Sequence, residues 1–464
     1  MSGTRIDLSG EYRFCGRMCA EVGEELAGGI FTELFESFCF TCATLDKRIV
    51  DGHIFRVGGV ALPEVGEYEF AIRISGGGVA VVGRDRRGLL HGYYTLLEMI
   101  RPISLDEGME EFALSACEIY DAPDLEIRAA HFCLFPENKL YELERFIRVC
   151  AILKCTHISL EFWGTLKFDC LAELGWADAH GKDEIRELIG LARELGVEVI
   201  PTFNHWGHAT QSRGRLGKHT VIDQNPRLAT MFNRTGWVWE IGQDRVRALH
   251  REIRRELIEL CGEGDFFHIE CDEAYEAEGV EGLCEFTDYL GEVCAELKAL
   301  GRRPMMWADM LLLRERFPRD VRYSCNLRCT EAEDVMLAGV PREVIAVDWQ
   351  YEVTEHPFKT SEHLKALGFE VMTAPYDRSY ANPAAAVRTA TELGLKGVMH
   401  TTWHTMHRGM RHLHLTLRRA WNKDFVWCDG EMMYVSALVG KAFPSGGDYA
   451  RSGWSERQIG PGIE

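Results

Sequence analysis

The central stretch of this sequence reads Phe266-Phe267-His268-Ile269-Glu270-Cys271-Asp272-Glu273-Ala274-Tyr275. It opens as a short apolar run and ends in two adjacent acids. Such a run after the helical pattern at 245–261 predicts a buried strand. Carboxylates at the carboxyl end of a parallel strand lie where α/β folds place their catalytic groups. The alternative is an acidic first turn of a helix, where the helix dipole favours Asp and Glu.

Seven more strand candidates alternate with helical patterns. The eight candidates begin near 127, 157, 197, 266, 304, 344, 369 and 397, and helical patterns cover 140–154, 183–195, 245–261, 281–300, 360–367 and 383–393. This alternation requires parallel pairing with right-handed crossovers, and eight such units can close into a barrel. A doubly wound sheet usually carries a glycine-rich phosphate loop after its first strand, and this sequence has none there. We therefore predict an α/β fold built on a (β/α)8 TIM barrel.

The first 120 residues follow a different pattern. Residues 67–74 alternate apolar and polar positions, Ser75-Gly76-Gly77-Gly78 turns the chain, and an apolar run follows at 79–82. This pattern predicts a β-hairpin. Residues 84–100 keep helical spacing, and Pro102 ends that helix. The sequence thus predicts a small accessory α/β domain at 1–120, a catalytic barrel at 121–440 and a loop-rich tail at 441–464.

Composition limits the classes of partner. The net charge of −20 argues against nucleic acid and anionic membranes. No run approaches the ~18 apolar residues of a membrane span, and the N-terminus lacks the apolar core of a secretory signal. The sixteen scattered cysteines then favour free thiols in a cytoplasmic protein. A zinc site at Cys15-x3-Cys19 with Cys39-x2-Cys42 is an alternative, although its spacing does not match a common finger.

The predicted strand ends carry many aromatic and charged residues. They include Glu161, Trp163, His208, Asp272, Glu273, Trp307, Asp309, Trp349, Tyr376 and Trp403, and the first strand itself carries Arg128 and His131. Indole rings around carboxylates suit a sugar, because pyranose C–H faces stack on aromatic rings. A single tryptophan is better explained by packing at the barrel mouth, whereas the whole set favours a sugar site. His205-x2-His208 lacks a third ligand at a recognisable spacing and no His-Glu-x-x-His occurs, so we expect neither a metal nor a cofactor.

At this point the chain resembles the glycoside hydrolase family 20 β-N-acetylhexosaminidases, over roughly residues 65–405. The stretch from His268 to Glu273 is similar to the family's His-x-Gly-Gly-Asp-Glu motif. Gly207-His208 resembles the end of its Pro-Gly-His segment, and Arg128 follows Asp121-Ala122-Pro123 where that family keeps a substrate-clamping arginine. The resemblance also includes the accessory domain.

The resemblance implies a retaining exo-glycosidase that removes terminal β-linked N-acetylhexosamine, either GlcNAc or GalNAc, from an oligosaccharide. In such enzymes the 2-acetamido oxygen of the substrate is the nucleophile and forms an oxazolinium intermediate. Glu273 would be the general acid/base and Asp272 would hold the acetamido group. The remaining expected roles are sugar-pocket walls for Trp307, Trp349 and Trp403, an acetamido contact for Tyr376 (or Tyr380), a hydroxyl clamp for Arg128, and support of the acid for His208 with Glu161.

Three departures from the family pattern bear on this expectation. Glu270 and Cys271 replace two glycines, Asn204-His205-Trp206 replaces Asp-x-Pro, and Thr405 stands where many members carry a sugar-binding glutamate. The changes at 270, 271 and 405 leave open a catalytically impaired, sugar-binding relative. An O-GlcNAc-hydrolase-like enzyme would carry Asp-Asp instead of Asp-Glu. From strand alternation we expect Glu270 to point into the barrel and to contact Arg128 or His131. The sequence leaves the oligomeric state open.

Overall fold

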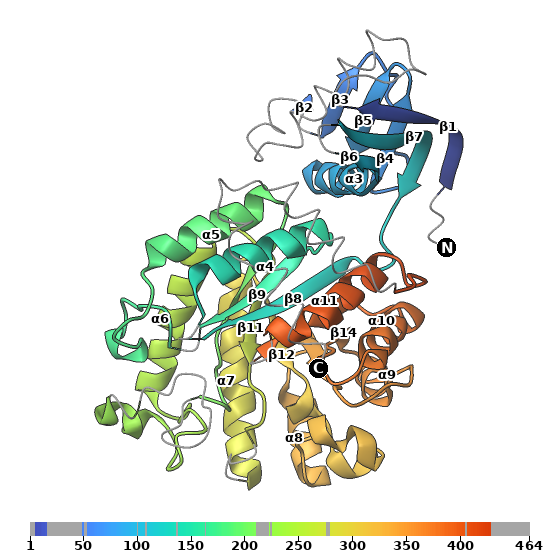
Figure 1. Cartoon of the computed structure of the whole chain (residues 1–464). Helices are drawn as coiled ribbons and strands as arrows, with labels where there is room; N and C mark the ends of the chain where they lie inside the picture. Colours follow the sequence, from blue (N-terminus) through green and yellow to red (C-terminus); the bar gives the residue numbers. More distant parts are fainter. Residues whose placement is uncertain are drawn as a thin grey trace.

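The computed structural model describes residues 5–15, 49–50, 53–99, 101–106, 109–135, 138–162, 164–209, 222, 225–274, 279–403 and 406–427. They form an antiparallel sheet with one helix, followed by a parallel barrel (Figure 1). Trp163, Thr405, the cysteines at 19, 39 and 42, and the predicted tail at 441–464 lie outside the described residues.

Eight parallel strands close the barrel, which confirms the predicted fold class. The strands are β8 (Ile127–Leu134), β9 (His157–Phe162), β10 (Glu198–Thr202), β11 (Phe266–Glu270), β12 (Arg303–Trp307), β13 (Ile345–Asp348), β14 (Glu370–Thr373) and β15 (Gly397–His400). Each begins within one residue of its predicted position, and β15 pairs with β8 to complete the ring. The strands consist almost entirely of buried residues, as expected for a sheet covered on both faces.

The helices lie outside the barrel, as Figure 1 shows. They are α4 (Leu140–Ile152), α5 (Lys182–Glu194), α6 (Asp244–Cys261), α7 (Gly279–Ala299), α8 (Thr330–Gly339), α9 (Lys359–Ala366), α10 (Ala381–Leu393) and α11 (Met406–Trp421). The sequence patterns did not predict α8 and α11. The buried face of α11 includes the polar residues His412, His414 and Thr416. A search for an apolar stripe therefore does not detect this helix. Among the helices of the described residues, none has the length and apolar character that a bilayer span requires.

The antiparallel sheet precedes the barrel. Its strands are β1 (Arg5–Cys15), β2 (Ile49–Val50), β3 (Ile54–Gly58), β4 (Phe70–Ser75), β5 (Gly78–Gly83), β6 (Arg101–Asp106) and β7 (Met109–Asp121). The predicted hairpin is β4 with β5, and the predicted helix is α3 (Arg86–Met99). A Cβ at Gly92 would lie 2.6 Å from Cγ1 of Val81, so this glycine lets α3 approach the sheet closely.

The barrel interior changes character along its axis. Ile127, Ile200, Met305 and the bulky aromatic residues belong to one buried cluster inside the ring. Trp307 ends β12, and Trp349 and Tyr376 follow β13 and β14, so these three rings lie toward the carboxyl ends of the strands. In barrels of this kind that end carries the active site.

Candidate active site

Asp272 and Glu273 follow β11 directly, at the carboxyl end of the barrel. Nδ2 of Asn204 donates to Oδ1 of Asp272 at 3.1 Å. Nε2 of His208 lies 2.6 Å from Oε2 of Glu273 and 3.7 Å from Oδ2 of Asp272. The Glu273 side chain is 19% exposed and that of Asp272 is 7% exposed. The pair thus combines a carboxylate that a ligand can reach with a neighbour held by fixed polar groups.

The backbone that presents this pair is unusual. Glu270, Cys271 and Glu273 have φ values of +57°, +71° and +49°. The pairing register of β11 with β12 also shifts between His268 and Glu270. A left-handed conformation costs an L-residue about 1–2 kcal/mol, and such strain collects at functional sites. The motif's two glycine positions are therefore positions where the backbone itself favours glycine.

The expectation for Glu270 rested on strict alternation from 268 to 272, which this shift breaks. Glu270 is fully buried, and its N–H donates to Nδ1 of His268 at 3.1 Å. Arg128, one of its two expected partners, binds carbonyl groups at the other end of the barrel. The expected pairing of Glu270 with Arg128 is therefore wrong.

The loop after β10 supports the acid pair from the side. A Cβ on Gly207 would lie 2.1 Å from the carbonyl oxygen of Asp272, so the two loops touch through backbone atoms. The ring of His208 packs at 4.1 Å from that of Trp237, whose Nε1 donates to the carbonyl of Glu273 at 2.8 Å. The predicted Gly207-His208 motif thus has a geometric reason: the glycine allows close approach and the histidine reaches the acid.

Asp309, just beyond β12, ties three parts of the site together. Its carboxylate accepts hydrogen bonds from the Glu273 N–H at 2.8 Å, from Nδ2 of Asn326 at 2.7 Å and from Nε1 of Trp349 at 3.0 Å. Burial, followed by the charge of Asp272, raises the pKa of Asp309 from 3.8 to about 7, against the hydrogen bonds that lower it. The sequence placed Asp309 at a strand end but gave it no role.

Aromatic side chains form a connected wall beside the acids. The rings of Trp307 and Trp403 lie 5.6 Å apart, and Nε1 of Trp403 donates to the hydroxyl of Tyr351 at 2.7 Å. Tyr351 lies 5.1 Å from Trp349 and 4.9 Å from Tyr376. The structure therefore brings together all four predicted aromatic residues. Tyr351 was missed, although it lies only two residues after Trp349, just beyond β13.

Two further tyrosines differ in their relation to this wall. Tyr380, the alternative to Tyr376, is half exposed and stacks on His412 at 4.4 Å, so Tyr376 is the one in the wall. Tyr323 was not predicted, and its ring meets Trp349 edge-on at 5.5 Å. Burial and the negative charge of Glu273 raise the pKa of Tyr323.

Arg128 does not belong to this site. It is the second residue of β8 and so lies at the amino end of the barrel. Its Nε donates to the carbonyl of Lys154 at 2.8 Å, and its Nη1 donates to that of Leu125 at 2.8 Å. Its guanidinium lies 4.9 Å from the ring centre of Trp421. The expected role as a substrate clamp is wrong, because the carboxyl ends of the strands are at the opposite end.

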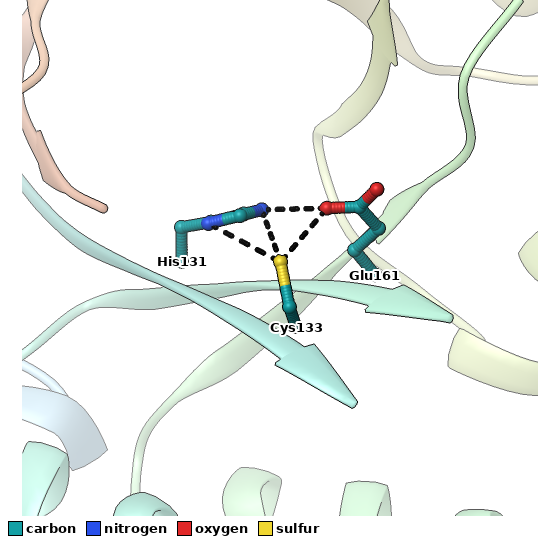
Figure 2. A group of neighbouring side chains, drawn as sticks. All are labelled: His131, Cys133 and Glu161. Carbon is teal, nitrogen blue, oxygen red and sulfur yellow. Dashed lines mark hydrogen bonds and ion pairs between the residues drawn. The ribbon is translucent and has the colours of Figure 1, made fainter. Parts of the chain in front are cut away.

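Glu161 contacts two residues of the neighbouring strand. Its Oε2 lies 3.1 Å from Nε2 of His131 and 3.0 Å from Sγ of Cys133, both on the neighbouring strand β8 (Figure 2). It was expected to support Glu273 together with His208; His208 contacts that acid, and the supporting role of Glu161 stays a prediction. Sequence reasoning named His131 and missed Cys133, although residues two apart on a strand share one face.

The family model that matches this chain is that of glycosyl hydrolase family 20, catalytic domain, over residues 173–407. The chain belongs to glycosyl hydrolase family 20. The match includes the acid pair, the loop with Gly207-His208 and the aromatic wall. Arg128, Cys133 and Glu161 lie before the matched segment.

Solved structures of this family share the fold. The N-acetyl-β-hexosaminidase of Streptomyces plicatus aligns with a TM-score of 0.62 and 16% identity, covering 94% of this chain and 93% of that one. The β-N-acetylhexosaminidase of Bacteroides fragilis aligns with a TM-score of 0.61 and 14% identity, covering 98% and 94%.

Two curated relatives match shorter segments. The lacto-N-biosidase of Bifidobacterium bifidum is 23% identical over 165 residues, and β-hexosaminidase A of Caenorhabditis briggsae is 24% identical over 162 residues. These segments are 35% and 32% of this chain, and they cover 14% and 28% of the relatives' own lengths.

Proposed function

We propose that this protein is a retaining exo-β-N-acetylhexosaminidase that releases terminal β-linked N-acetylhexosamine by substrate-assisted catalysis. The observation that carries the proposal is the pair itself: a reachable Glu273 bonded to His208, beside an Asp272 held by Asn204. Membership of family 20 and the names of the solved relatives support the same activity. The aromatic wall supports a sugar as the ligand, since indole and phenol rings stack on the C–H faces of a pyranose.

In this proposal Glu273 protonates the leaving oxygen and later takes a proton from water. The contact with His208 keeps its carboxyl group in one orientation. Asp272 accepts the acetamido N–H, so that the acetamido oxygen is aligned with the anomeric carbon. The attack then takes place within one bound molecule, where orientation supplies a large part of the rate.

The remaining residues shape the pocket. Trp307, Trp349 and Trp403 enclose the sugar ring, and Tyr376 donates to the acetamido oxygen. Asp309 holds both the backbone of Glu273 and the indole of Trp349, so it fixes the acid relative to the wall. Fixed dipoles and rigid donors of this kind need no reorganisation during the reaction.

The decisive experiment compares two aryl glycosides that differ at C2. The aryl β-N-acetylglucosaminide should turn over orders of magnitude faster than the aryl β-glucoside, because the glucoside lacks the internal nucleophile. A thiazoline mimic of the bicyclic intermediate should bind far more tightly than N-acetylglucosamine, as mimics of high-energy states do. Comparable rates on the two glycosides would exclude participation of the acetamido group.

Variants separate an enzyme from a sugar-binding relative. Glu273→Gln should lower kcat for poor leaving groups by about 100- to 10,000-fold, the usual contribution of general acid/base catalysis. Glu259→Gln, at an exposed position on α6, is the matched control and should leave kcat unchanged. If the wild-type protein binds N-acetylglucosamine but turns over neither glycoside, it is the catalytically impaired, sugar-binding relative that the changes at 270, 271 and 405 leave open.

A further inference from the structure

Three side chains converge on one point between β8 and β9. Nε2 of His131, Sγ of Cys133 and Oε2 of Glu161 are separated by 3.6 Å (nitrogen to sulfur), 3.1 Å (nitrogen to oxygen) and 3.0 Å (sulfur to oxygen). Figure 2 shows all three side chains pointing toward one another from two adjacent strands. Their residues are 0%, 3% and 3% exposed. Among the described residues, this is the one group of three potential metal ligands that lies this close together.

The arrangement differs from that of a cysteine nucleophile activated by histidine. In such a relay the imidazole uses one ring nitrogen for the nucleophile and the other for the carboxylate. Here the carboxylate lies against Nε2, the thiol is nearer to Nε2 than to Nδ1, and the thiol also meets the carboxylate directly. The three atoms surround a common centre instead of forming a chain.

We propose that His131, Cys133 and Glu161 bind a Zn²⁺ ion through Nε2, Sγ and Oε2. Around a tetrahedral Zn²⁺ with bonds of about 2.3 Å to sulfur and about 2.0 Å to nitrogen and oxygen, ligand atoms lie roughly 3.3–3.6 Å apart. The observed separations approach these values, so small rotations of the Cys133 and Glu161 side chains complete the site. Three protein ligands leave one position for water.

Charge and ligand type both favour this ion. A thiolate, a carboxylate and a neutral imidazole carry two negative charges, which one Zn²⁺ neutralises, and buried charge is costly unless it is compensated. Sulfur and imidazole ligands select zinc over Mg²⁺ and Ca²⁺, which prefer shells of oxygen. The proposed site therefore takes a borderline-soft divalent cation and excludes the hard ones.

The position links the ion to the aromatic wall. The His131 ring lies 4.6 Å from that of Trp403 and meets that of Trp307 edge-on at 5.8 Å. A bound ion fixes the orientation of the imidazole, as it does for other metal-ligating histidines. The proposal concerns binding alone and does not depend on the hydrolytic activity proposed above.

The test measures zinc bound to the full-length protein. Wild type, Cys133→Ser and Cys294→Ser are equilibrated with Zn²⁺, passed through a desalting column and analysed by elemental mass spectrometry. Cys294 is a buried cysteine of α7 and is the matched control. We expect Cys133→Ser to hold one equivalent less than the other two proteins. Zinc held by other cysteines appears in all three proteins and cancels in this difference.

A second variant covers the case in which Cys133→Ser does not fold, as judged by circular dichroism. Glu161→Gln keeps the shape of the side chain and removes one ligand charge. It should weaken Zn²⁺ affinity at least ~10-fold in competition with a chromophoric chelator, the lower end of the effect of disturbing a metal site. Co²⁺ bound to wild type should show sulfur-to-metal charge-transfer absorption that is reduced in Cys133→Ser. Equal zinc content in wild type and Cys133→Ser, or equal affinity in wild type and Glu161→Gln, would overturn the proposal.

Discussion

Glu270 and Cys271 have φ values of +57° and +71°, a backbone conformation that favours glycine, although both residues carry side chains. Both side chains are fully buried, so neither position gains from exposure to water. The strain lies immediately before the acid pair, where strained backbone commonly serves to aim a functional group. In this chain the strand end therefore relies on the surrounding packing to hold it.

Cys271→Val tests that strain. Valine is similar to cysteine in size and apolar, but its branched Cβ is poorly tolerated at positive φ. We expect a loss of about 1–3 kcal/mol in the free energy of unfolding, measured by chemical denaturation. Cys294→Val, in an ordinary helical conformation within α7, is the control and should lose less. Equal losses at both positions would show that the left-handed backbone at 271 stores no strain.

The raised pKa of Asp309 predicts a specific pH dependence of stability. Because the folded pKa is about 7 and the usual value is 3.8, the folded state holds the proton more tightly than the unfolded state between these values. The contribution of Asp309 to stability is therefore greatest below pH 3.8 and is lost as the pH rises toward 7. Because the side chain of Asp309→Asn cannot ionise, the stability of this variant does not fall for this reason as the pH rises.

The measurement is the melting temperature of wild type and Asp309→Asn across this pH range. The amide should make the variant less stable overall, since it brings two hydrogens to a side chain that accepts three N–H donors. The difference between the two proteins should narrow as the pH rises. Parallel curves would contradict a raised pKa at Asp309.

At the scale of elements, the loops after β10 and β11 are in backbone contact at Gly207 and Asp272. An added Cβ at 207 would lie 2.1 Å from the Asp272 carbonyl, which must then move. Misplacement by about 1 Å can cost on the order of 100-fold in rate. The contact between these loops, which are 65 residues apart at His208 and Glu273, thus decides the geometry of the acid pair.

Gly207→Ala should therefore lower kcat by roughly 10- to 100-fold while the protein remains folded. Gly190→Ala is the matched control, because a Cβ at that position of α5 meets nothing within 4 Å. It should leave kcat unchanged and stabilise the helix by up to ~1 kcal/mol, as alanine is the better helix former. Steady-state kinetics with an aryl N-acetylglucosaminide and thermal melts give both readouts. Unchanged kcat in Gly207→Ala would mean that the loops yield without moving Asp272.

For the whole molecule, the end of α11 joins the sheet to the barrel. Trp421 stacks on Phe70 of β4 at 5.8 Å, and its Nε1 donates to Oδ2 of Asp121 at 2.9 Å. Arg418 pairs with Glu98 of α3 at 2.7 Å. Arg128 adds its guanidinium beneath Trp421 at the amino end of the barrel. This face stabilises the molecule and lies opposite the catalytic end.

Arg128→Met separates these roles. Its guanidinium donates to the carbonyl groups of Leu125, Glu126 and Lys154, so its loss should cost on the order of 3 kcal/mol of stability. KM should stay within about twofold of wild type, because Arg128 lies at the amino end of the barrel and does not contact the substrate. Arg255→Met removes a surface ion pair on α6 and should change stability by less than ~1 kcal/mol. A raised KM with unchanged stability would show that Arg128 does bind the substrate.

The sequence by itself determined the barrel, its eight strands and the acid pair, because these depend on local periodicity and on strand ends that any parallel barrel places on one side. It also predicted that Trp307, Trp349, Tyr376 and Trp403 lie at one end of the barrel, since each ends a strand or follows one closely. Arg128 was misplaced because its role was taken from the family resemblance, although the predicted strand begins near 127 and Arg128 is therefore at its amino end.

Only the tertiary structure shows which side chains contact one another. Glu161 lies 28 residues from Cys133 and Asp309 lies 36 residues from Glu273, so no spacing in the sequence announces these contacts. Tyr351 and Trp403 meet across 52 residues for the same reason. The convergence of His131, Cys133 and Glu161 arises from the pairing of β8 with β9, which puts three ligands on one interior face. Periodicity is a local property of the chain, whereas the approach of side chains depends on how the barrel closes.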